Sequence, residues 1–182
     1  MPGQRVILTY KDYEVLPADG RRYELHEGEL SVTPAPSPQH QRIIRNLNEV
    51  LWHHVKSRGL GEVFFAPIDC ILGETTVVQP DLVYLDTGRL SIVSSRGLEG
   101  APTLVVEILS PTTTLIDRST KRQLYARYGV PYYWIADPEA HTIEAYGLSE
   151  GGYQLAARVA GREPVSLPPF LDLTFAPATL WP

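Results

Sequence analysis

The hydrophobic positions along the chain repeat with two periods, one typical of helices and one typical of strands. Between residues 38 and 58 apolar side chains recur every three or four positions, which predicts one long helix with a single buried stripe. Residues 103–109 form an almost continuous apolar run, as expected of a central strand buried on both faces. Shorter runs bounded by turn residues predict a hairpin over 22–32, strands over 62–72, 77–84, 132–136, 142–146 and 153–159, and helices over 9–16 and 117–128.

This order of elements predicts an α/β (α+β) fold in a single domain that covers residues 1–182. Hydrophobic residues make up 43% of the chain and charged residues 20%, so the chain can bury a sizeable core. No apolar run approaches the roughly 18 residues that a membrane span needs. Residues 1–8 lack the basic-then-apolar layout of a signal peptide, so we expect a cytoplasmic protein.

Cysteine content and net charge narrow the possible functions. The single cysteine, Cys70, rules out an intramolecular disulfide, and no Cys/His cluster has the spacing of a zinc site. The formal charge of −5 argues against a nucleic-acid binder that relies on an overall basic surface. A local basic rim can still coexist with an acidic metal site.

Two acidic residues stand in or beside apolar strands, where a carboxylate is costly unless it is paired or metal-bound. Asp81 follows Pro80 at the entry to one strand, and Glu107 lies between Val106 and Ile108 inside another. On neighbouring strands they would form a hard oxygen site for Mg²⁺ or Mn²⁺, with the Ile108 carbonyl as a third ligand. The alternative is that each carboxylate is neutralised separately, by an arginine or by backbone amides.

Lys121 and Glu24 are the next candidates. Lys121 lies about one turn into the helix that follows the Glu107 strand, and it shares a face with apolar residues further along that helix. From there its ammonium group could stabilise phosphate charge or orient a water molecule at a metal site. The alternatives are a surface lysine paired with Asp117 and, for Glu24, an ordinary solvent-facing residue of the first hairpin.

Four further side chains are candidates for substrate contacts: His40, Gln79, Arg118 and Arg122. His40 lies in the first turn of the long helix, and Gln79 stands close to Asp81 in the sequence. The two arginines flank Lys121 and could hold phosphate groups. Helix capping or packing would equally explain His40, and a charge cluster on a helix usually forms a solvated face.

These residues belong to an ordered series of motifs that resembles one known family. The series comprises Tyr23-Glu24-Leu25, Ser37-Pro38-Gln39-His40, Val78-Gln79-Pro80-Asp81-Leu82, Val105-Val106-Glu107-Ile108-Leu109-Ser110-Pro111, Asp117 through Lys121 to Tyr125, and Gly129-Val130-Pro131 with Tyr133-Trp134 and Asp137-Pro138. No single motif in the series is specific. Their order and spacing resemble the Uma-type restriction endonuclease family, a branch of the PD-(D/E)xK nuclease superfamily, from about residue 10 to the C-terminus.

The resemblance implies a restriction-endonuclease-like fold, in which helices flank a central mixed sheet. It implies that Asp81 and Glu107 ligate a divalent metal, usually Mg²⁺, and that Glu24 completes the acidic cluster. The superfamily's usual lysine would lie two residues after the glutamate, but Leu109 stands there, and Lys121 looks like a migrated replacement. Tyr132 is a second departure, at a position where the family commonly carries an acidic residue.

The leading hypothesis is a metal-dependent endonuclease that cleaves DNA. A Mg²⁺ or Mn²⁺ ion held by Asp81, Glu107 and the Ile108 carbonyl would position water, with Lys121 and Glu24 assisting. The rival hypothesis is a non-catalytic, nuclease-like scaffold that binds nucleic acid or a protein partner, including as a homodimer. Action on RNA or on a small phosphodiester is a third possibility.

Overall fold

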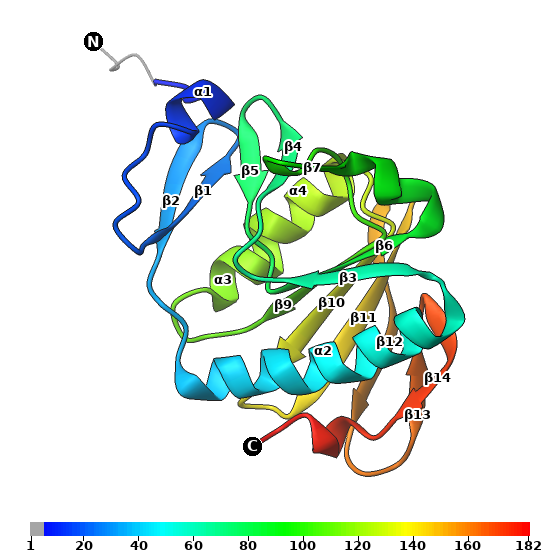
Figure 1. The fold of residues 1–182 in the computed structure, drawn as a ribbon. Helices are drawn as coiled ribbons and strands as arrows, with labels where there is room; N and C mark the ends of the chain where they lie inside the picture. The colour runs from blue at the N-terminus through cyan, green and yellow to red at the C-terminus, as the bar shows by residue number, and fades with distance from the viewer. Residues whose placement is uncertain (1–5) are drawn as a thin grey trace.

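The computed structural model describes residues 6–182. The expectation that residues 1–8 contain no signal peptide therefore falls partly on residues outside this range. Within it, no helix is both long and apolar enough to cross a membrane. Helices and mixed sheets together form the expected α/β architecture (Figure 1).

The first of two six-stranded sheets carries the N-terminal hairpin. Its strands follow the order β2-β1-β5-β4-β8-β7, and all neighbours are antiparallel except β4 and β8. The strands are β1 (Arg22–His26), β2 (Glu29–Thr33), β4 (Cys70–Gly73), β5 (Thr76–Val78), β7 (Val93–Ser94) and β8 (Gly97–Leu98). The hairpin predicted over residues 22–32 is thereby confirmed.

The second sheet is the central one, in the order β12-β11-β10-β9-β6-β3. Only β9 and β10 are parallel, so the sheet is mixed. Its strands are β3 (Gly61–Phe65), β6 (Leu82–Asp86), β9 (Leu104–Ile108), β10 (Tyr132–Asp137), β11 (Thr142–Ser149) and β12 (Gly152–Ala160). A separate ribbon near the C-terminus consists of β13 (Val165–Leu167) and β14 (Phe170–Phe175).

Helices cover both faces of the central sheet. The long helix α2 (Pro38–Arg58) crosses one face, and a second helical segment lies behind the sheet in Figure 1. That segment consists of α3 (Thr114–Ile116), the π-helical turn η2 (Asp117–Lys121) and α4 (Arg122–Arg127). The short elements are α1 (Tyr10–Tyr13) and the 3₁₀ helices η1 (Thr87–Ile92) and η3 (Pro177–Thr179).

Alternation along the central strands decides which side chains reach which layer. Leu82 and Val106 pack in the core beneath α2, whereas Val83 and Val105 pack in the core beneath α4. The same alternation turns Glu107 toward α4. Because β6 and β9 pair with Leu82 opposite Val106, one further step along the two strands brings Asp81 next to Glu107 at the strand end.

Two segments, each predicted as one strand with a bulge or edge at Pro67 or an interruption at Pro80, are divided between the two sheets. Residues 62–72 form β3 and β4, and residues 77–84 form β5 and the first part of β6. Pro67 and Pro80 lie in the links, where a residue without an N–H cannot donate to a strand ladder. The helix predicted over 9–16 is shorter than expected, and the helical segment after β9 begins before residue 117. The long helix over 38–58 is confirmed.

Candidate active site

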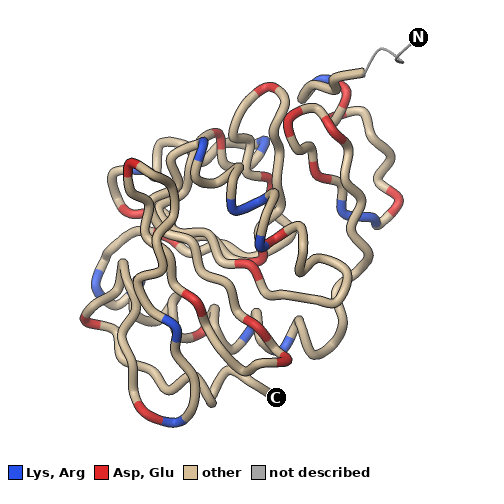
Figure 2. The backbone as a smooth tube through the Cα atoms, turned by 180° about the vertical axis from the view of Figure 1, so that it is seen from behind, with Lys and Arg blue, Asp and Glu red and all other residues tan. Residues whose placement is uncertain are grey.

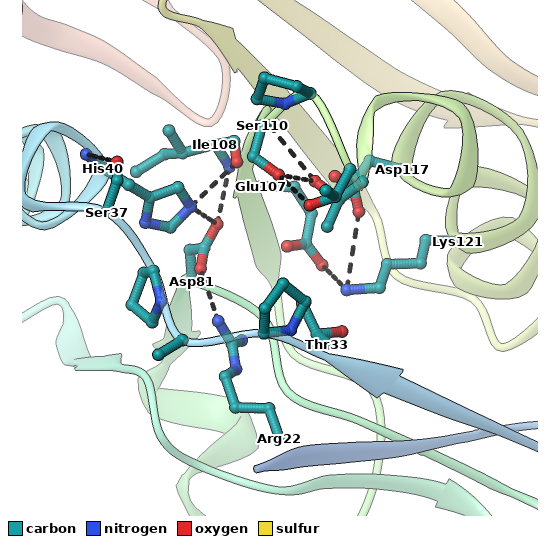
Figure 3. Close-up of a pocket in the computed structure, with 16 residues that line it drawn as sticks. Arg22, Thr33, Ser37, His40, Asp81, Glu107, Ile108, Ser110, Asp117 and Lys121 are labelled. Atoms are coloured by element: carbon teal, nitrogen blue, oxygen red, sulfur yellow. Dashed lines mark hydrogen bonds and ion pairs between the residues drawn. The ribbon is translucent and has the colours of Figure 1, made fainter. Parts of the chain in front are cut away.

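A cavity of about 260 Å³ opens where the first sheet, the central sheet and the helices meet (Figure 3). Its walls are the loop 33–37, the first turn of α2, the loop 110–113 that follows β9, and the inner side of η2. Asp81, Glu107, Ile108 and Lys121 all line it, as does His40. The structure therefore brings together most of the chemistry-bearing residues singled out from the sequence.

Asp81 is buried and held by three donors. Its Oδ2 accepts a 2.8 Å hydrogen bond from the Ile108 backbone N–H and lies 3.1 Å from Nε2 of His40. Its Oδ1 lies 3.4 Å from Nη1 of Arg22, which also donates to the Gln79 carbonyl through Nη2. This network fixes the carboxylate at the strand end and points it into the cavity (Figure 3).

Glu107 is buried on the face of the central sheet that α4 covers. Its Oε1 accepts hydrogen bonds from Nζ of Lys121 at 3.1 Å and from the Tyr125 hydroxyl at 2.6 Å. Burial, helped by nearby carboxylates such as Asp117 and Asp81 and opposed by Lys121, raises the pKa of this carboxyl to about 8. Glu107 therefore holds a proton more readily than an ordinary glutamate until further positive charge enters the cavity.

Lys121 lies at the centre of the acidic cluster. Its Nζ is 2.9 Å from Glu24 Oε1, 3.1 Å from Glu107 Oε1 and 3.6 Å from Asp117 Oδ1. Burial opposes the charged form, but the three carboxylates outweigh it and raise the pKa of Lys121 above its usual value. The side chain is thus a permanent cation, and the alternative of an exposed surface lysine is wrong because only 5% of the residue is accessible.

Glu24 anchors the lysine from the first sheet. It is buried, its Oε1 also accepts the Gln79 backbone N–H at 2.7 Å, and its Oε2 lies 3.2 Å from Nε2 of His26. Burial would raise the pKa of Glu24, but Lys121 and His26 together with the Gln79 amide lower it instead. A solvent-facing role for Glu24 is therefore excluded, and the residue instead joins the first sheet to the cavity.

A π-helical turn brings Lys121 to this position. Residues Asp117–Lys121 form the turn, and π-helical turns are frequent at functional sites. Its first carbonyl, that of Asp117, accepts a 3.0 Å hydrogen bond from the buried Tyr133 hydroxyl. The sequence predicts a regular helix here, because no local pattern distinguishes an inserted residue from an ordinary turn.

Three predicted substrate contacts lie away from the cavity. The Gln79 side chain donates to Asp69. Gln79 contacts the site through its backbone, whose N–H donates to Glu24. Arg118 is bound to Glu144 at 2.7 Å and to Asp137 at 3.2 Å on the far side of the helix. The guanidinium group of Arg122 lies over the Tyr146 ring and donates to the Tyr153 carbonyl. The structure thus gives these two arginines protein partners and does not bring them to the cavity.

Arg22 and Tyr125 are site residues that the sequence analysis does not single out as functional. Arg22 lines the cavity. The sequence could have indicated this, because Arg22 lies two positions before Glu24 on the same strand and so points to the same face. Tyr125 lies four positions after Lys121 on the helix, where an aromatic residue reads as part of the core. Only its hydroxyl contact with Glu107 shows that it has a role at the site.

Comparison with known proteins identifies the family. A family model described as "Putative restriction endonuclease", Uma2, matches residues 10–179. The chain belongs to the Uma2 family. The resemblance inferred from the motif series is confirmed.

A solved structure supports the same fold. A protein from Anabaena variabilis, described as "a putative nuclease", matches with a TM-score of 0.78 and 21% sequence identity. The match covers 95% of this chain and 97% of that chain. No curated protein matches the chain. The restriction-endonuclease-like fold of this Uma2 protein is therefore established by the family and the structural match together.

The charges around the Uma2 cavity fit a divalent cation. Four buried carboxylates face two cationic side chains there: Glu24, Asp81, Glu107 and Asp117 against Arg22 and Lys121. A divalent ion would balance the excess, and carboxylate oxygens are the ligands that Mg²⁺ and Mn²⁺ prefer. Across residues 6–182, no three His, Cys, Asp or Glu side chains already stand together as a metal-binding group. A metal here would therefore need a backbone ligand, and the Ile108 carbonyl is the available one.

Proposed function

We propose that this protein is a divalent-metal-dependent endonuclease that hydrolyses phosphodiester bonds in DNA. The observation that carries the proposal is the meeting of Asp81, Glu107 and Lys121 in one cavity, although they come from two strands and a helix. Two carboxylates beside a buried cation provide both a metal site and a fixed positive charge for a phosphate group. Membership of a family described as restriction endonucleases supports the same reaction.

Each residue has a distinct part in the proposed reaction. Asp81, Glu107 and the Ile108 carbonyl would hold Mg²⁺ or Mn²⁺, which when bound activates water and stabilises charge on the reacting phosphate. Lys121 stays protonated because its pKa is raised, so it acts as a donor to the phosphate or the attacking water and not as a base. Glu24 and Asp117 keep its ammonium group in place.

Arg22 would extend this positive charge toward the substrate. It lines the cavity beside Asp81, and its side chain is 17% exposed, so part of it faces solvent. Its pKa is raised despite burial, because Asp81, Glu107 and Glu24 surround it. We therefore assign Arg22 to phosphate contact, the role that the sequence analysis gives to Arg118 and Arg122.

Cleavage of supercoiled plasmid with Mg²⁺ or Mn²⁺ tests the proposal. We expect Asp81→Asn and Lys121→Met each to lower the rate at least about 100-fold, since each removes charge stabilisation at the reacting group. Lys56→Met is the matched control, because Lys56 is exposed on α2 beside Trp52. Equal residual cleavage by all four proteins would show that the nuclease activity does not come from this cavity.

One observation favours a second candidate, a nuclease-like scaffold without activity. The two loops at the cavity mouth, residues 33–37 and 110–113, contain no lysine or arginine. In Figure 2 basic and acidic segments are interspersed, and no continuous basic band crosses the face in view. Under this alternative the chain would bind nucleic acid or a protein, or would pair with a second copy. Calorimetric titration with Mn²⁺ separates the two, because a scaffold would show no metal binding that Asp81→Asn abolishes.

A further inference from the structure

The imidazole of His40 lies between the two oxygens assigned to the metal. Its Nε2 is 3.1 Å from Asp81 Oδ2 and 3.0 Å from the Ile108 carbonyl oxygen. Both oxygens are acceptors, so the Nε2–H tautomer of the ring would donate to both. Figure 3 shows the ring pointing from the start of α2 into the space in front of Asp81.

The two separations from Nε2 agree with the spacing of adjacent ligands in a coordination shell. In an octahedral site with bonds of about 2.1 Å, adjacent ligand atoms lie about 3.0 Å apart, because the separation is the bond length multiplied by the square root of two. The two measured separations from Nε2 agree with that value. A cation in front of Nε2 would therefore find Asp81 Oδ2 and the Ile108 carbonyl oxygen each at the distance of an adjacent ligand.

The surroundings of His40 hold the ring in this position. His40 is 8% exposed, and its backbone N–H donates to the Ser37 hydroxyl in the cap of α2 at 3.2 Å. The N-terminus of a long helix is thereby fixed against the end of β9. The ring therefore projects into the cavity from a capped helix end.

The second ring nitrogen of His40, Nδ1, is not bound, within the residues that the structure describes, by any donor that would fix the tautomer of the ring. Nδ1 of His40 is buried and has no hydrogen-bond partner among residues 6–182. A donor at Nδ1 would lock the proton on Nε2, and no such donor is present in the described part of the chain. The ring can therefore adopt the Nδ1–H form, in which the lone pair of Nε2 is available to a cation.

We propose that His40 is a direct metal ligand through Nε2, and that it makes the site prefer Mn²⁺ to Mg²⁺. This inference rests on the proposed metal-dependent function and specifies its ion. Mg²⁺ favours an all-oxygen shell, whereas an imidazole nitrogen is a better ligand for transition metals. His40 would then join Asp81 and the Ile108 carbonyl, Glu107 would complete the set only after turning away from Lys121 and Tyr125, and water or substrate oxygens would fill the remaining positions.

Pulsed electron paramagnetic resonance of the wild-type protein loaded with Mn²⁺ tests the proposal without a variant. We expect a ¹⁴N coupling typical of a directly bound imidazole, which changes to a ¹⁵N coupling when the protein contains ¹⁵N-histidine. Calorimetry adds an independent measure: His40→Ala should weaken Mn²⁺ binding at least about tenfold and Mg²⁺ binding less than threefold. His53→Ala, an exposed position in the same helix, should change neither affinity.

The outcomes separate this proposal from the proposed function. Mn²⁺ binding that Asp81→Asn abolishes, but without nitrogen coupling, would overturn the role of His40 and leave the metal site in place. Unchanged or tighter Mn²⁺ binding by His40→Ala would overturn it as well, since His40 would then act only as a hydrogen-bond donor that metal displaces. Absence of any binding that depends on Asp81 would overturn both proposals.

Discussion

Nζ of Lys121 lies 3.1 Å from Oε1 of Glu107, although the two residues are 14 positions apart in the chain. In the superfamily pattern that the sequence resembles, the lysine would follow the glutamate by two positions, where this chain has Leu109. Here the ammonium group reaches the glutamate from a helix that packs over the strand. The position of the charge therefore depends on how that helix docks on the sheet.

Removing the buried cation should destabilise the fold in a pH-dependent way. Lys121→Met leaves three buried carboxylates without their cation, which costs roughly 3 kcal/mol near pH 8. At pH 5 the cost should be smaller, because carboxylates that have lost their cation take up protons more readily. Urea denaturation at both pH values measures the difference, with Lys56→Met as control. Equal destabilisation at both pH values would contradict the ion-pair account.

Glu107 should give the metal-free protein a stability that falls as pH rises. Burial holds its pKa at about 8 in the folded protein, against an ordinary value of 4.5, so the folded state binds more protons than the unfolded state between these values. The contribution of Glu107 to the free energy of unfolding is thus complete below pH 4.5 and is lost as pH rises through 8. Glu107→Gln should lack this slope and gain stability relative to wild type at pH 8–9. Glu62→Gln, an exposed substitution on β3, should follow wild type throughout.

Tyr133 should affect cleavage by supporting the π-helical turn. Tyr133→Phe removes the hydroxyl that binds the Asp117 carbonyl, at a cost of about 1–2 kcal/mol in stability. We also expect at least about a tenfold loss of cleavage, because a shift of about 1 Å in a positioned group has effects of that size or larger. Tyr153→Phe is a matched control, since its buried hydroxyl binds the Val130 carbonyl away from the turn. Equal cleavage by the two variants would mean that the turn does not position Lys121.

Substitution of Arg22, which lines the cavity, and of Arg118, which lies outside it, should affect cleavage differently. Arg22→Ala should lower cleavage about tenfold or more, because the guanidinium group lies beside Asp81 in the cavity. Arg118→Ala should change it less than threefold, because Arg118 is occupied by Glu144 and Asp137. The rates of both variants can be compared on the same plasmid. A larger loss in Arg118→Ala would restore the phosphate-binding role predicted from the sequence.

The sequence predicts the central elements because their signals are local and strong. The apolar run around Glu107 and the single stripe of the long helix leave few alternatives, and both elements form where expected. The division of residues 62–72 and 77–84 between two sheets is not predictable in the same way. Each piece is short and apolar, and its sheet is decided by distant partners rather than by its own residues.

The residues of the candidate site also differ in how far the sequence reveals them: some have a local signal, and others depend on distant contacts. Asp81 and Glu107 are recognisable because a carboxylate in an apolar strand needs a compensating partner. Arg118 and Arg122 are candidates for phosphate contact because they lie close to Lys121 in the sequence. In the structure the helix directs their side chains away from the cavity, toward Glu144 and Tyr146. The contact of His40 with Ile108 spans 68 positions, and no local pattern reveals it.

The π-helical turn at Asp117–Lys121 also has an evolutionary meaning. A π turn can be described as a regular helix with one residue inserted, so loss of a single codon among residues 118–120 would restore the regular helix. Lys121 would keep its phase with α4, while Asp117 and α3 would rotate by about 100° away from it. The sheet would remain intact. A deletion of three nucleotides therefore provides a short genetic route from the proposed nuclease to a descendant that keeps the sheet and lacks the contact between Asp117 and Lys121.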